Sequence, residues 1–336
     1  MAAELLSVNE LKVHFHTRDG VVKAVDGVTY SLASGETLGV VGESGSGKSV
    51  HALAMMGLVP MPPGKIEGGD VSLSGRSLIR MSENERRGVC GNEIAMVFQD
   101  PMTSLNPVHR IGHQLAEPLR IHKGMGRRDA WARAGELLQM VGIPNPESRL
   151  NGYPHQFSGG MRQRVMIAMA IACDPGIVIA DEPTTALDAT IQAQVLELMR
   201  GIQKRSGLAI IMITHDLGVI ADMADRVLVM YAGRAVELGS ADQLFRDARH
   251  PYTWGLIDSL PRYDTTEQGG LRPIGGQPPS LINLPEGCSF GPRCRYTQDI
   301  CRTSAPALME VEDGHRAACH FACDAGLRDL SPRKHA

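Results

Sequence analysis

The chain has 336 residues, of which 43% are hydrophobic and 21% are charged, and its net charge at pH 7 is −3. This length accommodates one large domain and a smaller one. The charge gives no reason to expect nucleic acid as a partner, because nucleic-acid-binding domains usually present a strongly basic face. No apolar run approaches the roughly 18 residues of a membrane span, and the N-terminus lacks the pattern of a secretion signal. We therefore expect a cytosolic location, where disulfides are rare.

Apolar runs that end in polar side chains predict a core of strands and helices. Residues 37–41 form one such run before a glycine-rich loop, and two later runs lead to Asp181 and to His215. Continuous apolar strands of this kind are typical of parallel sheets that are buried on both faces and that bind ligands at the carboxyl ends of the strands. The prediction is an α/β core with a mainly parallel sheet.

The pattern changes elsewhere along the chain. The first 35 residues alternate in a way that predicts a small N-terminal antiparallel β subdomain. Residues from about 100 to 172 carry apolar side chains at helical spacing and predict an inserted helical subdomain. We expect one domain over 1–240, a helix and Pro-rich connector over 241–282, and a small cysteine-rich C-terminal extension over 283–336.

The clearest motif, GESGSGKS, follows the first apolar strand and precedes a predicted helix. Its glycines allow backbone N–H groups to converge on a phosphate, and the helix N-terminus adds partial positive charge. Lys48 can reach the β- and γ-phosphates, and the Ser49 hydroxyl can take a Mg²⁺ position. The residues expected to bind nucleotide here are Gly42, Ser44, Gly45, Ser46, Gly47, Lys48 and Ser49. A Gly/Ser-rich loop with a chance lysine is the alternative, and the flanking strand and helix disfavour it.

Polar side chains at the ends of other predicted strands extend this site. Asp181 can hold Mg²⁺, and Glu182 can orient an attacking water. His215 can address a γ-phosphate, and Gln99 can meet the metal and its water. Taken singly, each has a plainer interpretation: the acidic pair caps a helix, the histidine is structural, and the glutamine is solvated.

A second anion site is predicted in FSGGMRQR, where Ser158, Gly159 and Gly160 open a helix. One nucleotide already has its binding loop, so a second anion site needs an explanation. Together and in this order, the motifs resemble those of an ABC-transporter ATPase, which is a P-loop NTPase, over residues 1 to about 240. The matching motifs are Walker A (42–49), the Q-loop (Gln99), the signature (158–160 with Arg162 and Gln163), Walker B (Asp181 with Glu182), the D-loop (186–188) and the H-loop (His215).

The resemblance implies that two ATPase domains pair head to tail, so that the signature helix of one contacts the γ-phosphate held by the other. ATP would join the two domains, and hydrolysis would release them. Phe15 is expected to stack on adenine. Met161 departs from the glutamine that many members carry, but the signature's backbone donors remain and an active site is expected. The implied catalytic residues are Glu182, His215 and Gln99, and the implied Mg²⁺ ligands are Ser49, Gln99 and Asp181.

Other segments indicate a branch of this family. FQDPMTSLNP and HPYTWGLIDSLPR resemble the dipeptide, oligopeptide and nickel importers, and FSGGMRQR resembles their D-type subunit. The resemblance implies ATP-driven import of di- or oligopeptides, with an F-type ATPase subunit, two transmembrane permease subunits and an extracytoplasmic solute-binding protein as partners. The chain would lie peripherally on the cytoplasmic face of the membrane. An importer of nickel or another small solute is an alternative, and a soluble non-transport ABC ATPase is another.

Four cysteines near the C-terminus, Cys288, Cys294, Cys301 and Cys319, have the spacing C-x5-C-x6-C-x17-C. Their region is poor in large apolar residues, so it needs a disulfide, a metal or a partner surface to become ordered. Structural zinc usually has closer cysteine pairs, whereas the cysteine ligands of iron–sulfur clusters vary in spacing. The resemblance implies a [4Fe–4S] cluster on these four residues. Zinc, reduced thiols and an artefactual disulfide are the alternatives. Cys323, with His315 and His320, competes for the place of the fourth ligand, although the residues around Cys319 fit the family better.

Overall fold

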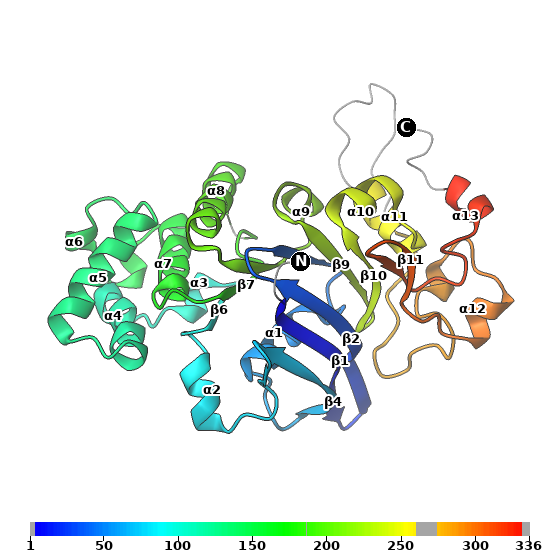
Figure 1. The fold of residues 1–336 in the computed structure, drawn as a ribbon, viewed down its shortest axis with the longest axis horizontal. Coiled ribbons are helices and arrows are strands. Elements are labelled where there is room, and N and C mark those ends of the chain that lie inside the picture. The colour runs from blue at the N-terminus through cyan, green and yellow to red at the C-terminus, as the bar shows by residue number, and fades with distance from the viewer. Residues whose placement is uncertain (1–3, 186, 260–273, 331–336) are drawn as a thin grey trace. The chain divides into compact units, whose positions relative to one another are not determined.

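The computed structural model describes residues 4–185, 187–259 and 274–330, which form two compact parts (Figure 1). The first part comprises the described residues within 1–5, 32–36 and 73–213, and the second comprises those within 6–31, 37–72 and 214–336. The chain passes between the two parts several times. Each part is therefore assembled from segments that are far apart in the sequence.

Parallel strands form the centre of the first part. They are β6 (Ile94–Val97), β7 (Ile177–Asp181) and β8 (Ala209–Ile213), with Ile94 opposite Ile177 in β7 and Ile177 opposite Ala209 in β8. Every residue of β7 and β8 is buried. These strands are apolar throughout because both of their faces are covered, and the polar residues follow at their carboxyl ends as predicted.

Residues 101–171, for which the spacing predicts helices, form the helical segment of the first part. Its elements are α3 (Pro101–Ser104), α4 (Ile111–His122), α5 (Arg127–Met140), α6 (Pro146–Arg149), η1 (Pro154–Gln156) and α7 (Gly159–Ile171). Helices α4, α5 and α7 pack together (Figure 1), and Leu115, Leu137 and Val165 are fully buried among them. The other elements of this part are β5 (Arg76–Ser77), α2 (Glu83–Val89) and α8 (Ala189–Ser206).

A mixed sheet dominates the second part. Strand β3 (Thr37–Val41) lies parallel to β9 (Arg226–Tyr231), and β10 (Arg234–Ser240) runs antiparallel to β9. Strand β12 (His315–Ala317) pairs antiparallel with β10, and β11 (Met309–Glu312) pairs antiparallel with β12. The prediction of a mainly parallel sheet is wrong for this region, because the C-terminal residues extend the sheet with antiparallel strands.

The N-terminal residues form long strands. Strands β1 (Glu4–Thr17) and β2 (Gly20–Ala33) are joined by only two residues and therefore form a hairpin. Strand β4 (Gly64–Leu73) neighbours β1 on its other side. Alternating burial along β1 matches the alternation in its sequence.

Helix α1 (Lys48–Met56) is fastened to β2 by a buried polar pair. His51 Nε2 lies 2.6 Å from the Tyr30 hydroxyl. Burial lowers the pKa of His51 to about 4 and raises the pKa of Tyr30, so both side chains are neutral at physiological pH. The hydrogen bond fixes the helix that begins at the glycine-rich loop. The remaining helices before the C-terminal extension are α9 (Leu217–Met223), α10 (Ala241–Asp247) and α11 (Pro251–Asp258).

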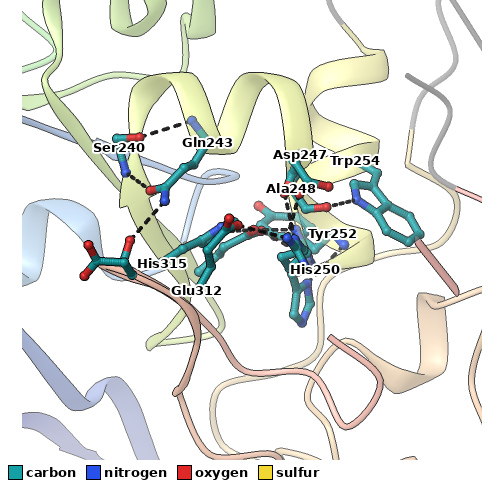
Figure 2. Close-up of polar contacts among 12 residues, drawn as sticks. Ser240, Gln243, Asp247, Ala248, His250, Tyr252, Trp254, Glu312 and His315 are labelled. Carbon is teal, nitrogen blue, oxygen red and sulfur yellow. Dashed lines mark hydrogen bonds and ion pairs between the residues drawn. The ribbon is translucent and has the colours of Figure 1, made fainter. Parts of the chain in front are cut away.

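Within the second part, a buried carboxylate joins the C-terminal extension to the preceding residues. Glu237 of β10 accepts hydrogen bonds from the backbone N–H groups of Arg249 (2.5 Å) and His250 (3.1 Å) and from His315 Nε2 of β12 (2.8 Å). Figure 2 labels His250 and His315 of this group. The extension also contains η2 (Gly291–Arg293), α12 (Asp299–Thr303) and α13 (Ala325–Asp329). Residues 260–273 of the predicted connector and residues 331–336 lie outside the described residues.

Candidate nucleotide site

The glycine-rich loop lies between β3 and α1, and its glycines have backbone conformations that other residues rarely adopt. Gly42, Gly45 and Gly47 have φ angles of 154°, 77° and 103°. A Cβ on Gly42 would lie 2.2 Å from the carbonyl oxygen of Met230, and a Cβ on Gly47 would lie 2.1 Å from that of Ala24. Only glycine fits the turn at these two positions, as the motif predicts.

Lys48 is buried within this loop, with 6% of its surface exposed. Its Nζ donates to the carbonyl oxygens of Gly42 (2.8 Å) and Glu43 (2.9 Å) and lies 3.4 Å from the Ser46 hydroxyl. The ammonium group is thereby held beside the N-terminus of α1, where the partial positive charge of the helix also favours an anion. Ser49 is exposed on the first turn of that helix.

Glu43 is a loop residue whose contacts the sequence analysis missed. Arg293, in the C-terminal extension, binds its carboxylate through two hydrogen bonds, and the Tyr252 hydroxyl accepts a hydrogen bond from its backbone N–H. Arg293 lies 250 positions from Glu43 in the sequence. No local sequence pattern indicates a contact between two residues that are so far apart in the sequence.

In the first part, the structure brings two of the predicted catalytic residues together. The Gln99 side-chain amide donates a 2.8 Å hydrogen bond to the carboxylate of Glu182, and the Thr185 hydroxyl donates to the same oxygen at 3.0 Å. Glu182 has a φ of 47°, and its backbone N–H is bonded to the carbonyl of Ile213. Asp181, which ends β7, is buried. Glu182 is thus held in one orientation by side-chain and backbone contacts.

The signature residues form an exposed helix N-terminus in the same part. Ser158 is the N-cap of α7, and its hydroxyl accepts a hydrogen bond from the backbone N–H of Met161 at 3.3 Å. Ser158 and Gly159 are exposed, whereas a Cβ on Gly160 would lie 2.6 Å from the Ile191 side chain. This terminus can offer backbone donors to an anion outside the chain.

The other predicted site residues lie in the second part. His215 is exposed and immediately precedes Asp216, the N-cap of α9. Phe15 is half-buried on β1, and a Cβ on Gly64 of β4 would lie 3.1 Å from its ring. The first residue of the predicted D-loop, Ala186, lies outside the described residues. The first part thus carries Gln99, 158–160, Asp181 and Glu182, and the second carries Phe15, 42–49 and His215.

The four predicted cysteine ligands surround one cavity in the second part. The cavity is lined by Cys288, Cys294, Cys301 and Cys319, together with His250, Phe290 and other residues of the second part. Cys323 is exposed and is not among the lining residues, so Cys319 is the fourth cysteine. Burial raises the pKa of Cys294 to about 11 and that of Cys319 to about 12. Across the described residues, no group of three or more His, Cys, Asp or Glu side chains is arranged to hold a metal ion, so this geometry gives the predicted metal centre no support.

Two family models match the chain. Residues 25–185 match the model described as "ABC transporter", and residues 236–301 match "Oligopeptide/dipeptide transporter, C-terminal region". Among solved structures, the dimeric post-hydrolysis state of the ATP-binding cassette MJ0796, bound to ADP and Pi, is 26% identical with a TM-score of 0.64. The match covers 70% of this chain and 99% of that one. The fold and the phosphate loop therefore define an ATP-binding cassette.

Curated relatives match along most of the sequence. The oligopeptide transport ATP-binding protein OppD of Bacillus subtilis (strain 168) is 53% identical over 311 residues, which is 93% of this chain and 87% of that protein. The dipeptide transport ATP-binding protein DppD of Escherichia coli (strain K12) is 49% identical over 320 residues, 95% of this chain and 97% of that protein. The chain belongs to the ABC-transporter ATP-binding family, in its oligopeptide/dipeptide branch.

As a member of this family, the chain is an ATP hydrolase that is coupled to transport. Within the part of the chain that the structure describes, no helix is both long and apolar enough to cross a membrane.

Proposed function

We propose that the chain powers the import of di- or oligopeptides, as one of two ATPase subunits on the cytoplasmic face of the membrane. The observation that carries this proposal is its similarity to oligopeptide and dipeptide transport ATP-binding proteins over most of both sequences. The match of residues 236–301 to the C-terminal region of such transporters supports the same branch. An importer of nickel or another small solute is the alternative. A soluble ABC ATPase outside transport is less favoured.

The proposed assembly contains an F-type ATPase subunit, two transmembrane permease subunits and an extracytoplasmic solute-binding protein. Head-to-tail pairing of the ATPases is supported by the exposed N-terminus of α7 at Ser158 and Gly159, which can serve an anion presented by another subunit. The similar cassette MJ0796 is described as dimeric and bound to ADP and Pi. In our proposal, ATP lies between the phosphate loop of one subunit and the signature helix of the other.

Each group of site residues has its own task in this proposal. The loop amides and Lys48 bind the phosphates, and Phe15 stacks on adenine. Glu182 orients and polarises the attacking water, and His215 contacts the γ-phosphate. Mg²⁺, when bound, neutralises phosphate charge, and oxygen donors of the kind present here suit it. The residues that would hold it are Ser49, Gln99 and Asp181.

Purification from native membranes tests the transport assignment. We expect the full-length chain to co-purify with a second ATPase and two permease subunits, and a peptide-loaded binding protein to stimulate ATP hydrolysis by that complex. The measurement is ATP turnover in reconstituted vesicles with the binding protein loaded in turn with peptide or with nickel. Stimulation by nickel alone would select the alternative solute. A chain that never fractionates with membranes would contradict the proposal.

We also propose that Cys288, Cys294, Cys301 and Cys319 hold a [4Fe–4S] cluster. The support is that all four line one cavity, and four cysteine thiolates are the usual ligands of this cluster. Zinc is the alternative occupant, because four cysteine thiolates can also hold a structural zinc ion.

Anaerobic purification of the full-length chain tests the cluster. We expect broad absorbance near about 400 nm and about four irons per chain, one for each cluster corner. Cys319→Ser should lose both signals, whereas Cys323→Ser, which changes an exposed thiol outside the cavity, should keep both. Stoichiometric zinc without iron would contradict the proposal.

A further inference from the structure

The phosphate loop is held from outside at Glu43. The backbone N–H of Glu43 donates to the Tyr252 hydroxyl at 2.8 Å, and its carbonyl oxygen accepts hydrogen bonds from Lys48 Nζ (2.9 Å) and from the backbone N–H of Ser46 (3.2 Å). Its carboxylate is bound by Arg293. The backbone groups and the side chain of this one residue are therefore all engaged. Any movement of its partners changes the position of the loop.

The guanidinium of Arg293 makes five hydrogen bonds, of which two go to Glu43. Nη1 and Nη2 bind the two Glu43 carboxylate oxygens at 2.6 and 2.9 Å, which is the two-pronged geometry that favours arginine over lysine. The remaining donors bind the Tyr231 hydroxyl (3.3 Å) and the carbonyls of Gly275 (2.9 Å) and Ile274 (3.3 Å). The Arg293 side chain is only 4% exposed, and that of Glu43 is 28% exposed. Because the pair is shielded and fully bonded, it is worth more than a surface ion pair.

Aromatic rings surround the guanidinium and connect it to the body of the second part. The ring centres of Tyr231 and Tyr252 are 4.6 Å apart, and that of Phe290 lies 5.3 and 5.4 Å from them. The Arg293 guanidinium carbon is 5.8 Å from the Tyr231 ring centre and 5.9 Å from that of Phe290. These rings leave the arginine little freedom to change rotamer. They also make Phe290 a direct neighbour of the contact at Glu43.

The same short segment forms part of the wall of the cysteine cavity. Cys288, Phe290 and Cys294 line the cavity, and Arg293 belongs to the single 3₁₀ turn between the last two. The backbone N–H of Cys294 bonds the carbonyls of Phe290 (3.0 Å) and Gly291 (3.2 Å). These bonds close the turn and place Arg293 directly before Cys294. One face of this turn meets the cavity, and Arg293 reaches the phosphate loop.

We propose that Arg293 is a positioning residue of the ATP site, and that the proposed [4Fe–4S] cluster on the cavity cysteines sets the affinity for ATP through Arg293. Ligation of Cys288 and Cys294 would fix the 3₁₀ turn and keep both Arg293 hydrogen bonds to the Glu43 carboxylate. Loss of that group would release the turn and loosen the loop before it binds phosphate. A preorganised loop has less conformational freedom to lose on binding ATP. The inference rests on the assignment of residues 42–49 as the phosphate site and on the proposed cluster in the cysteine cavity.

The first test measures the dissociation constant of Mg-ATP for the purified full-length chain by calorimetry. Arg293→Gln is expected to weaken binding at least about fivefold, within the usual range of coupling between sites. In a Glu43→Ala background, the same substitution should have no further effect, because the side chain that Arg293 binds is gone. Arg295→Gln is the matched control, since Arg295 is two positions away and exposed. Lys48→Ala tests the loop assignment separately, because unchanged ATP binding by that variant would refute the phosphate site itself.

The second test asks whether the cavity acts through Arg293. Loss of the proposed cluster from the cavity, by Cys319→Ser or by a chelator, is expected to weaken Mg-ATP binding when Arg293 is present. The same loss should not weaken Mg-ATP binding further in Arg293→Gln. If Arg293→Gln does not fold, Arg293→Lys replaces it. Lysine keeps the charge but cannot bind both carboxylate oxygens as arginine does, so its dissociation constant should lie between those of the wild-type chain and a full loss of the contact. An unchanged dissociation constant in both Arg293 variants would overturn the proposal. So would a loss of binding-competent protein without a change in affinity, because that is the mark of a purely structural role.

Discussion

Glu182→Gln is expected to lower ATP turnover by about 10²- to 10⁴-fold, the usual contribution of a positioned acid–base group, while ATP binding is retained. In the structure, the Glu182 carboxylate accepts hydrogen bonds from Gln99 and Thr185. An amide in its place can still hydrogen-bond, but it cannot polarise an attacking water as a carboxylate does. The geometry is preserved because the backbone of residue 182 is fixed by its bond to Ile213. Turnover and Mg-ATP affinity should be measured in parallel on the assembled transporter.

A matched control distinguishes this role from a general effect of charge. Glu136 is an exposed carboxylate on α5 whose contact is an ion pair with Arg133, so Glu136→Gln should leave turnover unchanged. Gln99→Ala should lower turnover less than Glu182→Gln, because it removes one partner of the carboxylate and leaves the carboxylate in place. Normal turnover in Glu182→Gln would show that another group activates the water.

The phosphate loop could be predicted from sequence because its whole signal is contained in eight neighbouring residues. Gly42 and Gly47 are required where carbonyl oxygens approach within 2.2 Å of a would-be Cβ, and Lys48 follows at the start of a helix. The proximity of Gln99 and Glu182 could also be anticipated, since both follow buried strands that lie side by side and parallel. The loop is therefore predictable from the backbone conformations that require glycine, and the Gln99–Glu182 contact is predictable from the order of the strands.

The contacts of the C-terminal extension could not be predicted in the same way. Arg293 and Glu43 are 250 positions apart, and Glu237 and His315 are 78 positions apart. Cysteine spacing indicates a shared ligand, but it does not indicate which other segment the ligand lies against. Low apolar content predicts an extension that cannot fold alone, and the structure meets this need by pairing β12 with the edge of β10. The extension depends on the ATPase body for its order.

Glu237→Ala is expected to lower the free energy of unfolding of this region by about 3 kcal/mol or more, because each buried donor left without an acceptor costs about 1–3 kcal/mol. Glu237 is fully buried and accepts from the backbone N–H groups of Arg249 and His250 and from His315. Alanine would leave these three donors buried without an acceptor. The same carboxylate binds His250, the N-cap of α11, and His315 of β12, so both should loosen together.

Tryptophan fluorescence provides a local readout of this loss. The chain has two tryptophans, Trp131 and Trp254. Trp254 donates from Nε1 to the Ala248 carbonyl at 2.7 Å (Figure 2), and Ala248 directly precedes Arg249, whose backbone N–H binds Glu237. In a Trp131→Phe background, urea unfolding followed at Trp254 should shift to markedly lower denaturant for Glu237→Ala. Asp242→Ala removes an exposed carboxylate of α10 and should cost no more than about 0.5 kcal/mol. Equal shifts in the two variants would mean that the buried carboxylate does not hold the extension, and that the strand pairing of β12 with β10 alone keeps it in place.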